Sequence, residues 1–256
     1  MEVFLNPDAW IALLTLTFLE IVLGIDNIIF ISIATGKLPV EKRKQATKIG
    51  MFLAMFMRIG LLFGINLLIQ MKKPWFTIDL SWLSAGITGQ SIILFLGGLF
   101  LIYKSTKEIH EKVDEKGHEE QEISKAATKS FQSVLLQIIM IDLVFSFDSI
   151  LTAVGMTNGV PGAIYIMITA VVVSVLIMMQ FAVPVGNFVN KHPSIQILGL
   201  SFLILIGFML LTESAHLSNA LIFGNHVTPV PKGYLYFAIS FSLLVEVLNM
   251  KVKKNK

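Results

Sequence analysis

Residues 19–30 read LEIVLGIDNIIF and lie within an apolar run that is long enough to cross a lipid bilayer. Two carboxylates, Glu20 and Asp26, interrupt this run, with Gly24 between them and Asn27 directly after. An ionised acid at the centre of a membrane span costs about 2.5 to 3.5 kcal/mol, so such acids persist where they face a polar interior and have partners. The stretch therefore marks a candidate site inside a membrane protein.

The whole chain has the composition of a membrane protein. Of its 256 residues, 55% are hydrophobic and 14% are charged, and the mean hydropathy is +0.76. A soluble domain has about 25% charged residues. The absence of cysteine excludes disulfides and thiolate metal sites. Runs of about 20 mostly apolar residues predict seven membrane-spanning helices, at residues 9–33, 46–69, 83–103, 130–155, 162–187, 195–213 and 233–250.

Lysine and arginine are distributed unequally between the loops, and this sets the predicted orientation. Cytoplasmic loops retain basic residues. Sixteen of the 20 basic residues fall in the 36–48, 104–129 and 188–194 loops and in the C-terminal tail. The N-terminus is therefore predicted outside and the C-terminus inside the cell. The mixed-charge 104–129 segment is predicted to be a solvated helical linker on the cytoplasmic side.

The opening stretch has a second copy in the fourth predicted span. Residues 141–152 read IDLVFSFDSILT and align with residues 19–30 at an offset of 122. In both copies an acid is followed by five residues, a second acid and a small polar residue. Three spans separate the copies, which is an odd number, so the second half must cross the bilayer in the opposite direction. The offset pairs Glu20 with Asp142, Gly24 with Ser146, Asp26 with Asp148, Asn27 with Ser149, Pro39 with Pro161 and Gly64 with Gly186, but Arg58 with Gln180.

The predicted fold is an all-α polytopic membrane protein. Residues 1–256 are expected to form a single membrane domain of two three-helix repeats with inverted topology and one further helix. Transporters with such repeats bind their substrates near the bilayer midplane. The first repeat is predicted at 1–103, the cytoplasmic loop at 104–129, the second repeat at 130–213 and the seventh helix at 233–250.

Four acids within the spans need compensation. On the insertion scale they would together cost about 10 kcal/mol if ionised in lipid. We expect them to be protonated, paired with a cation, or paired with Arg58, which is expected to neutralise one of them at most. Hard divalent cations such as Mg²⁺, Ca²⁺ and Mn²⁺ prefer carboxylate, carbonyl and water oxygens. The candidate metal ligands are therefore Glu20, Asp26, Asn27, Asp142, Asp148 and Ser149.

The spacing of the acids also bears on the helices that carry them. Residues i and i+6 on a regular helix differ by about 9 Å along the axis and by about 240° in direction, so they do not share a face. Gly24 and Ser146 lie between the acids, and glycine makes unwinding least costly. We therefore predict local distortion near residues 23–27 and 145–149, where a broken helix would offer backbone carbonyls to an ion.

Two further charged residues lie within predicted spans. Arg58 is predicted to pair with a site carboxylate, and the alternative is that its side chain snorkels toward the cytoplasmic face. Glu246 lies near the cytoplasmic end of the seventh span. It is expected to snorkel, to pair with Lys251, or to act in a proton relay.

The chain resembles the TerC family of bacterial integral membrane proteins in four stretches: LEIVLGIDNIIF, IDLVFSFDSILTAVG, FMR in the second span and VEVLN near the C-terminus. The resemblance covers nearly the whole chain and points to the seven-span branch without an appended soluble domain. It implies an association with tellurium resistance and with manganese export, within the LysE superfamily of exporters. Through the resemblance a metal role carries onto the six candidate ligands, with Mn²⁺ as the expected ion, although members of the family differ in substrate.

The leading hypothesis is a divalent-metal exporter of the bacterial inner membrane that works by alternating access, with inward proton exchange as its drive. No nucleotide-binding motif is present, so direct coupling to ATP is not expected. The expected partners are the metal ion and the lipid bilayer, without nucleic acid, and homo-oligomer formation is left open. One alternative is an intramembrane aspartyl enzyme with Asp26 and Asp148 as its dyad. The other is a non-transporting membrane partner that holds a structural ion and recruits proteins through the 104–129 loop.

Overall fold

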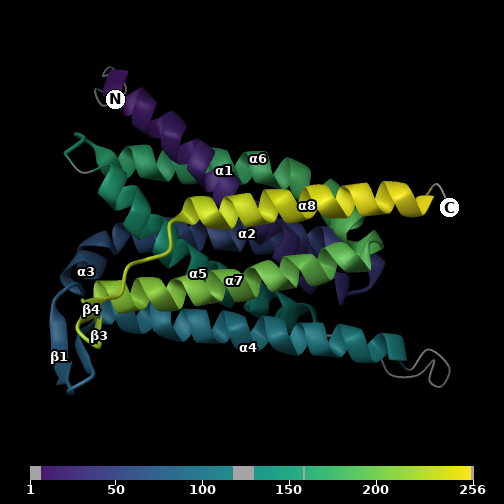
Figure 1. Cartoon of the computed structure of the whole chain (residues 1–256). Coiled ribbons are helices and arrows are strands. Elements are labelled where there is room, and N and C mark those ends of the chain that lie inside the picture. Colours follow the sequence, from purple (N-terminus) through teal and green to yellow (C-terminus); the bar gives the residue numbers. More distant parts are fainter. Residues whose placement is uncertain (1–6, 118–129, 158, 255–256) are drawn as a thin grey trace. The chain divides into compact units, whose positions relative to one another are not determined.

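A computed structural model describes residues 7–117, 130–157 and 159–254 (Figure 1). Most of these residues are helical. The helices are α1 (Pro7–Gly36), α2 (Val40–Phe63), α3 (Ile65–Gln70), α4 (Gly89–Gly117), α5 (Phe131–Met156), α6 (Ala163–Lys191), α7 (Pro193–Leu217) and α8 (Lys232–Lys254). The strands of the described residues are β1 (Pro74–Asp79), β2 (Leu83–Thr88), β3 (Leu221–Ile222) and β4 (Asn225–His226).

Six of the described helices are long and apolar enough to cross a membrane, namely α1, α2, α5, α6, α7 and α8. The polytopic, all-α membrane fold predicted from the sequence is therefore confirmed. α4 has an apolar first half and a charged second half, with the sequence GQSIILFLGGLFLIYKSTKEIHEKVDEKG. The count of seven spans, the inverted repeat and the orientation remain predictions.

Two of the predicted spans have wrong bounds. The second, predicted over 46–69, is interrupted at Gly64, whose amide bonds to the carbonyl of Gly60 and closes the end of α2. The third, predicted over 83–103, begins as a helix only at Gly89. Its first six residues form β2, because they satisfy their backbone hydrogen bonds by antiparallel pairing with β1.

The first compact unit joins residues 1–67 to residues 125–191. It contains α1, α2, α5 and α6, which are the first two helices of each predicted repeat. α1 packs mainly against α6, α2 packs against α5 and α6, and α1 also contacts α5 and α2. Phe30, Ile138, Ile150 and Ile166 are fully buried in this bundle. Both acidic stretches, one on α1 and one on α5, therefore lie within one packed body.

The second compact unit joins residues 68–124 to residues 192–256. Its main contact is between α4 and α7, which lie side by side. A Cβ added to Gly98 would stand 2.6 Å from the carbonyl oxygen of Gly207, and a Cβ added to Gly207 would stand 2.8 Å from that of Gly98. Only glycine allows the two backbones to approach this closely. α8 packs against α7 and is largely uncovered within the unit.

A small antiparallel sheet in the order β1-β2-β3-β4 belongs to the same unit. It lies at the end where α4 begins and α7 ends (Figure 1). Phe223 and Gly224 connect β3 to β4 with positive φ angles of 50° and 77°, as a two-residue hairpin turn requires. The amide of Gly86 donates to the carbonyl of Ser218 at 2.8 Å and ties β2 to the end of α7.

The predicted linker 104–129 begins as part of α4, and its residues 118–129 lie outside the described part of the chain. Glu108 is 1% exposed and pairs with Lys104 at 2.8 Å. One turn further, Lys112 Nζ donates to Gln196 Oε1 on α7. The prediction of a solvated linker is therefore wrong for this part, because one side of the charged helix end is buried and bonded to α7.

Candidate functional site

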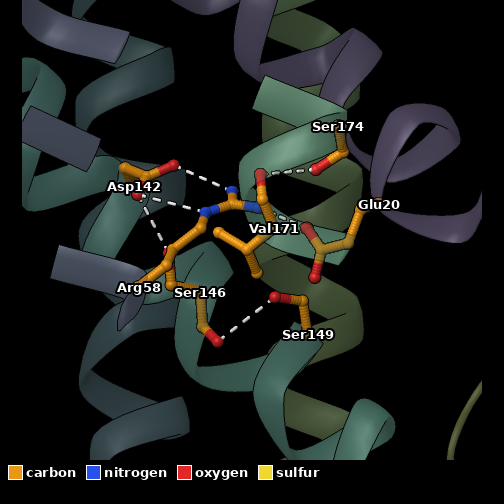
Figure 2. Close-up of polar contacts among 7 residues, drawn as sticks. All are labelled: Glu20, Arg58, Asp142, Ser146, Ser149, Val171 and Ser174. Carbon is orange, nitrogen blue, oxygen red and sulfur yellow. Dashed lines mark hydrogen bonds and ion pairs between the residues drawn. The ribbon is translucent and has the colours of Figure 1, made fainter. Parts of the chain in front are cut away.

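A buried arginine joins two of the predicted site acids within the first unit. Arg58 of α2 pairs with Glu20 of α1 and Asp142 of α5, and each of the three residues is at most 5% exposed. Arg58 Nη2 donates to Asp142 Oδ1 at 2.9 Å, Nε donates to Asp142 Oδ2 at 3.4 Å, and Nη1 pairs with Glu20 Oε2. Figure 2 shows the guanidinium between the two carboxylates.

The two acids are the equivalent first acids of the two predicted copies. The sequence leads us to expect that Arg58 neutralises one acid at most, whereas the structure places it on both. The planar guanidinium carries five donors in a fixed fork, so one side chain can serve two carboxylates. One guanidinium therefore contacts both first acids, although its single charge balances one carboxylate.

Two serines on α5 complete the polar cluster. Ser146 Oγ donates to Asp142 Oδ2 at 2.9 Å. Ser149 Oγ donates to the backbone carbonyl of Ser146 at 3.3 Å, so the lone pairs of its oxygen are not used in that bond. Both contacts are drawn in Figure 2. Asp142 is therefore held from two directions, by Arg58 and by the hydroxyl one helical turn further along α5.

A cavity of about 20 Å³ opens beside the ion pair. A space of this size holds about one water molecule, so it also suits a single small cation. Asn27, Arg58 and Asp142 supply polar groups to its wall, and Gly24, Met51 and Met178 supply apolar ones. Asn27 Oδ1 is buried and accepts no hydrogen bond within the described part of the chain.

A buried carbonyl oxygen without a partner is unfavourable, and a donor or a cation beside it removes the cost. Carboxylate and amide oxygens are the ligands that hard divalent cations prefer. The donor set at the cavity therefore fits such an ion, through Asp142 and Asn27.

Both acidic stretches lie on uninterrupted helices. α1 is helical through residues 23–27 and α5 through residues 145–149, so the predicted distortion is wrong. Gly24 has a different role: a Cβ there would stand 2.0 Å from Met178 Sδ, so glycine leaves room for the thioether of Met178 against α1. Ser146 likewise serves as a hydrogen-bond donor to Asp142 and does not interrupt its helix.

The structure brings together some of the predicted ligands and not all of them. Glu20 and Asp142 meet at Arg58, and Asn27 and Asp142 share the cavity. Asp148 is half-buried on α5, and the side chain of Asp26 lies outside the described side chains. Among the side chains that are described, no three of His, Asp and Glu lie close enough to hold one metal ion. The six-residue metal site stays a prediction.

Glu246 lies on α8 and belongs to the second unit. It is half-buried at a groove of about 320 Å³ whose polar wall includes Ser194, Ser201 and Ser242. Its predicted pairing or relay role stays a prediction.

Sequence reasoning missed two contacts of this site. The bond from Ser146 to Asp142 has a signal in the sequence, since residues four apart share one face of a helix. The contact of Gly24 with Met178 has none, because the two residues come from helices far apart in the chain.

These features define the class of the molecule: a polytopic α-helical membrane protein with a buried, charged site among its apolar helices. The chain belongs to the TerC family of integral membrane proteins, whose family model matches residues 5–256. The family predicted by resemblance is thus confirmed.

Curated relatives extend over most of the chain. The UPF0053 inner membrane protein YgdQ of Escherichia coli (strain K12) is 47% identical over 251 residues, which cover 98% of this chain and 96% of that protein. A UPF0053 protein of Haemophilus influenzae is 43% identical, with coverage of 97% and 96%. YoaE of Escherichia coli (strain K12) is 41% identical over 255 residues, which cover 45% of that longer protein. No solved structure matches the chain. The protein is a multi-pass protein of the bacterial inner membrane.

Proposed function

We propose that the protein exports a divalent metal ion, with Mn²⁺ as its substrate, by alternating access of two inverted halves in exchange for protons. The observation that carries the proposal is the buried cluster of Glu20, Arg58 and Asp142 beside an ion-sized cavity. Asn27 presents a partnerless oxygen to that cavity within the described residues. The cluster holds two carboxylates against one guanidinium, which supports a cation as the substrate.

The anionic ligand at the proposed site is the carboxylate of Asp142, although the thioethers of Met51 and Met178 also line the cavity. The chain has no cysteine to supply a thiolate, and a carboxylate with an amide oxygen supports a hard divalent ion. We propose that Asp142 and Asn27 hold the ion at the cavity, and that Glu20, Asp26, Asp148 and Ser149 contribute oxygens along its path. Protons that replace the metal on Asp26 and Asp148 would drive its release, while Glu20 and Asp142 pair with Arg58.

Transport accounts for these residues better than the two alternatives. An aspartyl enzyme would use Asp26 and Asp148 and would give no role to the arginine bridge. A structural ion requires a closed set of ligands, whereas here a guanidinium occupies two of the carboxylates that would bind it. Competition from Arg58 would weaken binding of the ion, as a transported ion requires because it must be released again. We therefore propose a transporter and not an enzyme.

The test is flux of radioactive Mn²⁺ in proteoliposomes that contain the full-length protein. We expect saturable, protein-dependent Mn²⁺ entry that makes the lumen more alkaline, because protons leave in exchange, as reported by an enclosed pH dye. Vesicles with the Asp148→Asn variant at equal protein density serve as the control. Mn²⁺ binding without flux would favour the structural-ion alternative, and metal-independent cleavage of a reporter peptide would favour the enzyme.

A further inference from the structure

Arg58 already fills the place of a cation on Glu20 and Asp142. It engages both oxygens of Asp142 and one oxygen of Glu20, at 4% exposure. Among the buried residues of the described chain, Arg58 is the one with a basic side chain. Because the guanidinium does not lose its proton in proteins, this compensating charge is permanent.

A metal ion at the cavity would stand beside the same guanidinium, because Arg58 and Asp142 both line that space. Like charges repel strongly at short range where little water screens them. A metal ion in the cavity and the guanidinium therefore compete for Asp142, and Glu20 pairs with the same guanidinium without lining the cavity. Binding of the ion requires Arg58 to release Asp142, whose two oxygens it engages.

We propose that Arg58 is a tethered counter-cation that alternates with the transported metal ion on Glu20 and Asp142. The inference rests on the proposed function and assigns a step of the cycle to one side chain. After the metal ion leaves, the empty carrier must change conformation again with its acids still in the membrane. Two buried carboxylates without a partner would oppose that step. Arg58 compensates the charge of these carboxylates, so the metal-free carrier can return. Competition from Arg58 also weakens metal binding enough for release.

One guanidinium serves the acids of both halves. The aligned position of the second repeat holds Gln180, which is an exposed residue of α6 and carries no charge. Loss of Arg58 therefore leaves no equivalent cation in the aligned position, so a single substitution tests the proposal.

The experiment compares two fluxes of Mn²⁺ in proteoliposomes of wild type and Arg58→Gln. Net flux, into vesicles without Mn²⁺, requires the empty carrier to return. Exchange of radioactive for unlabelled Mn²⁺, present on both sides, requires only the loaded carrier to move. We expect Arg58→Gln to reduce net flux by about tenfold or more while exchange stays within about twofold. We also expect its affinity for Mn²⁺ in detergent, measured by calorimetry, to rise by about tenfold.

Lys48→Gln is the matched control, because it removes a basic charge from an exposed position of the same helix. It should leave both fluxes and the affinity unchanged. If Arg58→Gln lowers net flux and exchange in equal proportion, or leaves net flux unchanged, the counter-cation role is overturned.

Arg58→Lys covers the case in which Arg58→Gln does not reconstitute. Lysine keeps the charge but lacks the fork that holds two carboxylates. Net flux of Mn²⁺ should therefore fall more than exchange in Arg58→Lys. An equal fall in net flux and exchange overturns the proposal. Absence of Mn²⁺ flux in wild type would instead refute the proposed function itself, so the two failures are distinguishable.

Discussion

Arg58 holds Asp142 with two nitrogens, at 2.9 Å from Nη2 to Oδ1 and 3.4 Å from Nε to Oδ2, whereas it holds Glu20 with one. Ser146 adds a further bond to Asp142. The two arms of the bridge are therefore unequal, and the arm to Glu20 has fewer bonds to break. Release of Glu20 is therefore the smaller structural change, whereas an ion in the cavity requires release of Asp142.

Asp142→Asn should destabilise the protein more than Glu20→Gln. Removing one partner of a buried ion pair costs about 3 to 5 kcal/mol, and Asp142 is the partner with more bonds. Unfolding of the purified variants in detergent, followed by circular dichroism, measures the difference. Glu41→Gln, at an exposed position of α2, is the control and should change stability by less than about 0.5 kcal/mol. If Glu20→Gln destabilises the protein as much as Asp142→Asn or more, the contact of Arg58 with Asp142 is not the stronger of the two.

Gly24→Ala should destabilise the contact of α1 with α6. The added Cβ would stand 2.0 Å from Met178 Sδ, and because the flexible end of Met178 can move aside, Gly24→Ala should be less stable than Gly155→Ala by about 1 kcal/mol, the low end of overpacking. Gly155→Ala on α5 is the control, since a Cβ there meets nothing within 4 Å. Alanine should gain helix propensity at that position and stabilise by up to about 1 kcal/mol. Shortening Met178 to alanine in the Gly24→Ala background should recover part of the loss, and failure to do so would place the clash elsewhere.

Asn27→Leu should separate metal binding from folding. Because Asn27 Oδ1 accepts no hydrogen bond in the described structure, its loss should cost less than about 1 kcal/mol of stability. Mn²⁺ affinity measured by calorimetry should nevertheless fall by about tenfold or more if that oxygen binds the ion. Ser32→Ala on the same helix, whose hydroxyl bonds to the carbonyl of Ile28, should leave the affinity unchanged. An Asn27→Leu variant that binds Mn²⁺ like wild type would remove Asn27 from the ligand set.

Asp26→Asn and Asp148→Asn should each abolish resistance of cells to added Mn²⁺ while the protein still reaches the membrane. Each variant keeps the shape of the side chain and removes a charge that we propose lies on the path of the ion. Growth on graded Mn²⁺, with protein level measured by immunoblot of membranes, gives the readout. Asp79→Asn in the exposed strand β1 should resist Mn²⁺ like wild type. Full resistance in both site variants would reject these two acids as part of the site.

The sequence predicted the membrane class and the importance of the acids, because both depend on the cost of charge in lipid, which is local to each residue. It placed Glu20 and Asp142 at equivalent positions, and the structure joins them through Arg58. It could not predict that one arginine serves both, since that depends on how three helices approach one another.

Other errors have the same physical origin. A glycine between two acids suggested an unwound helix, but the helix is regular, and Gly24 lies against the side chain of Met178 on another helix. The charge of the 104–129 segment suggested solvent, but Glu108 is buried with Lys104 as its partner. In both segments the local structure depends on side chains from distant parts of the chain, and the residue type alone does not predict which side chains these are.

The composition of the first compact unit has a consequence for biosynthesis. Its four helices come from both halves of the chain, so translation must produce α5 and α6 before the bundle can close. Glu20 and Arg58 emerge from the ribosome long before Asp142, and α1 and α2 are in contact. The early hairpin can thus enter the membrane with Glu20 and Arg58 as a pair, and Asp142 later joins a cation that is already in place. The three charges of the bridge can then be inserted in the order in which the residues are made.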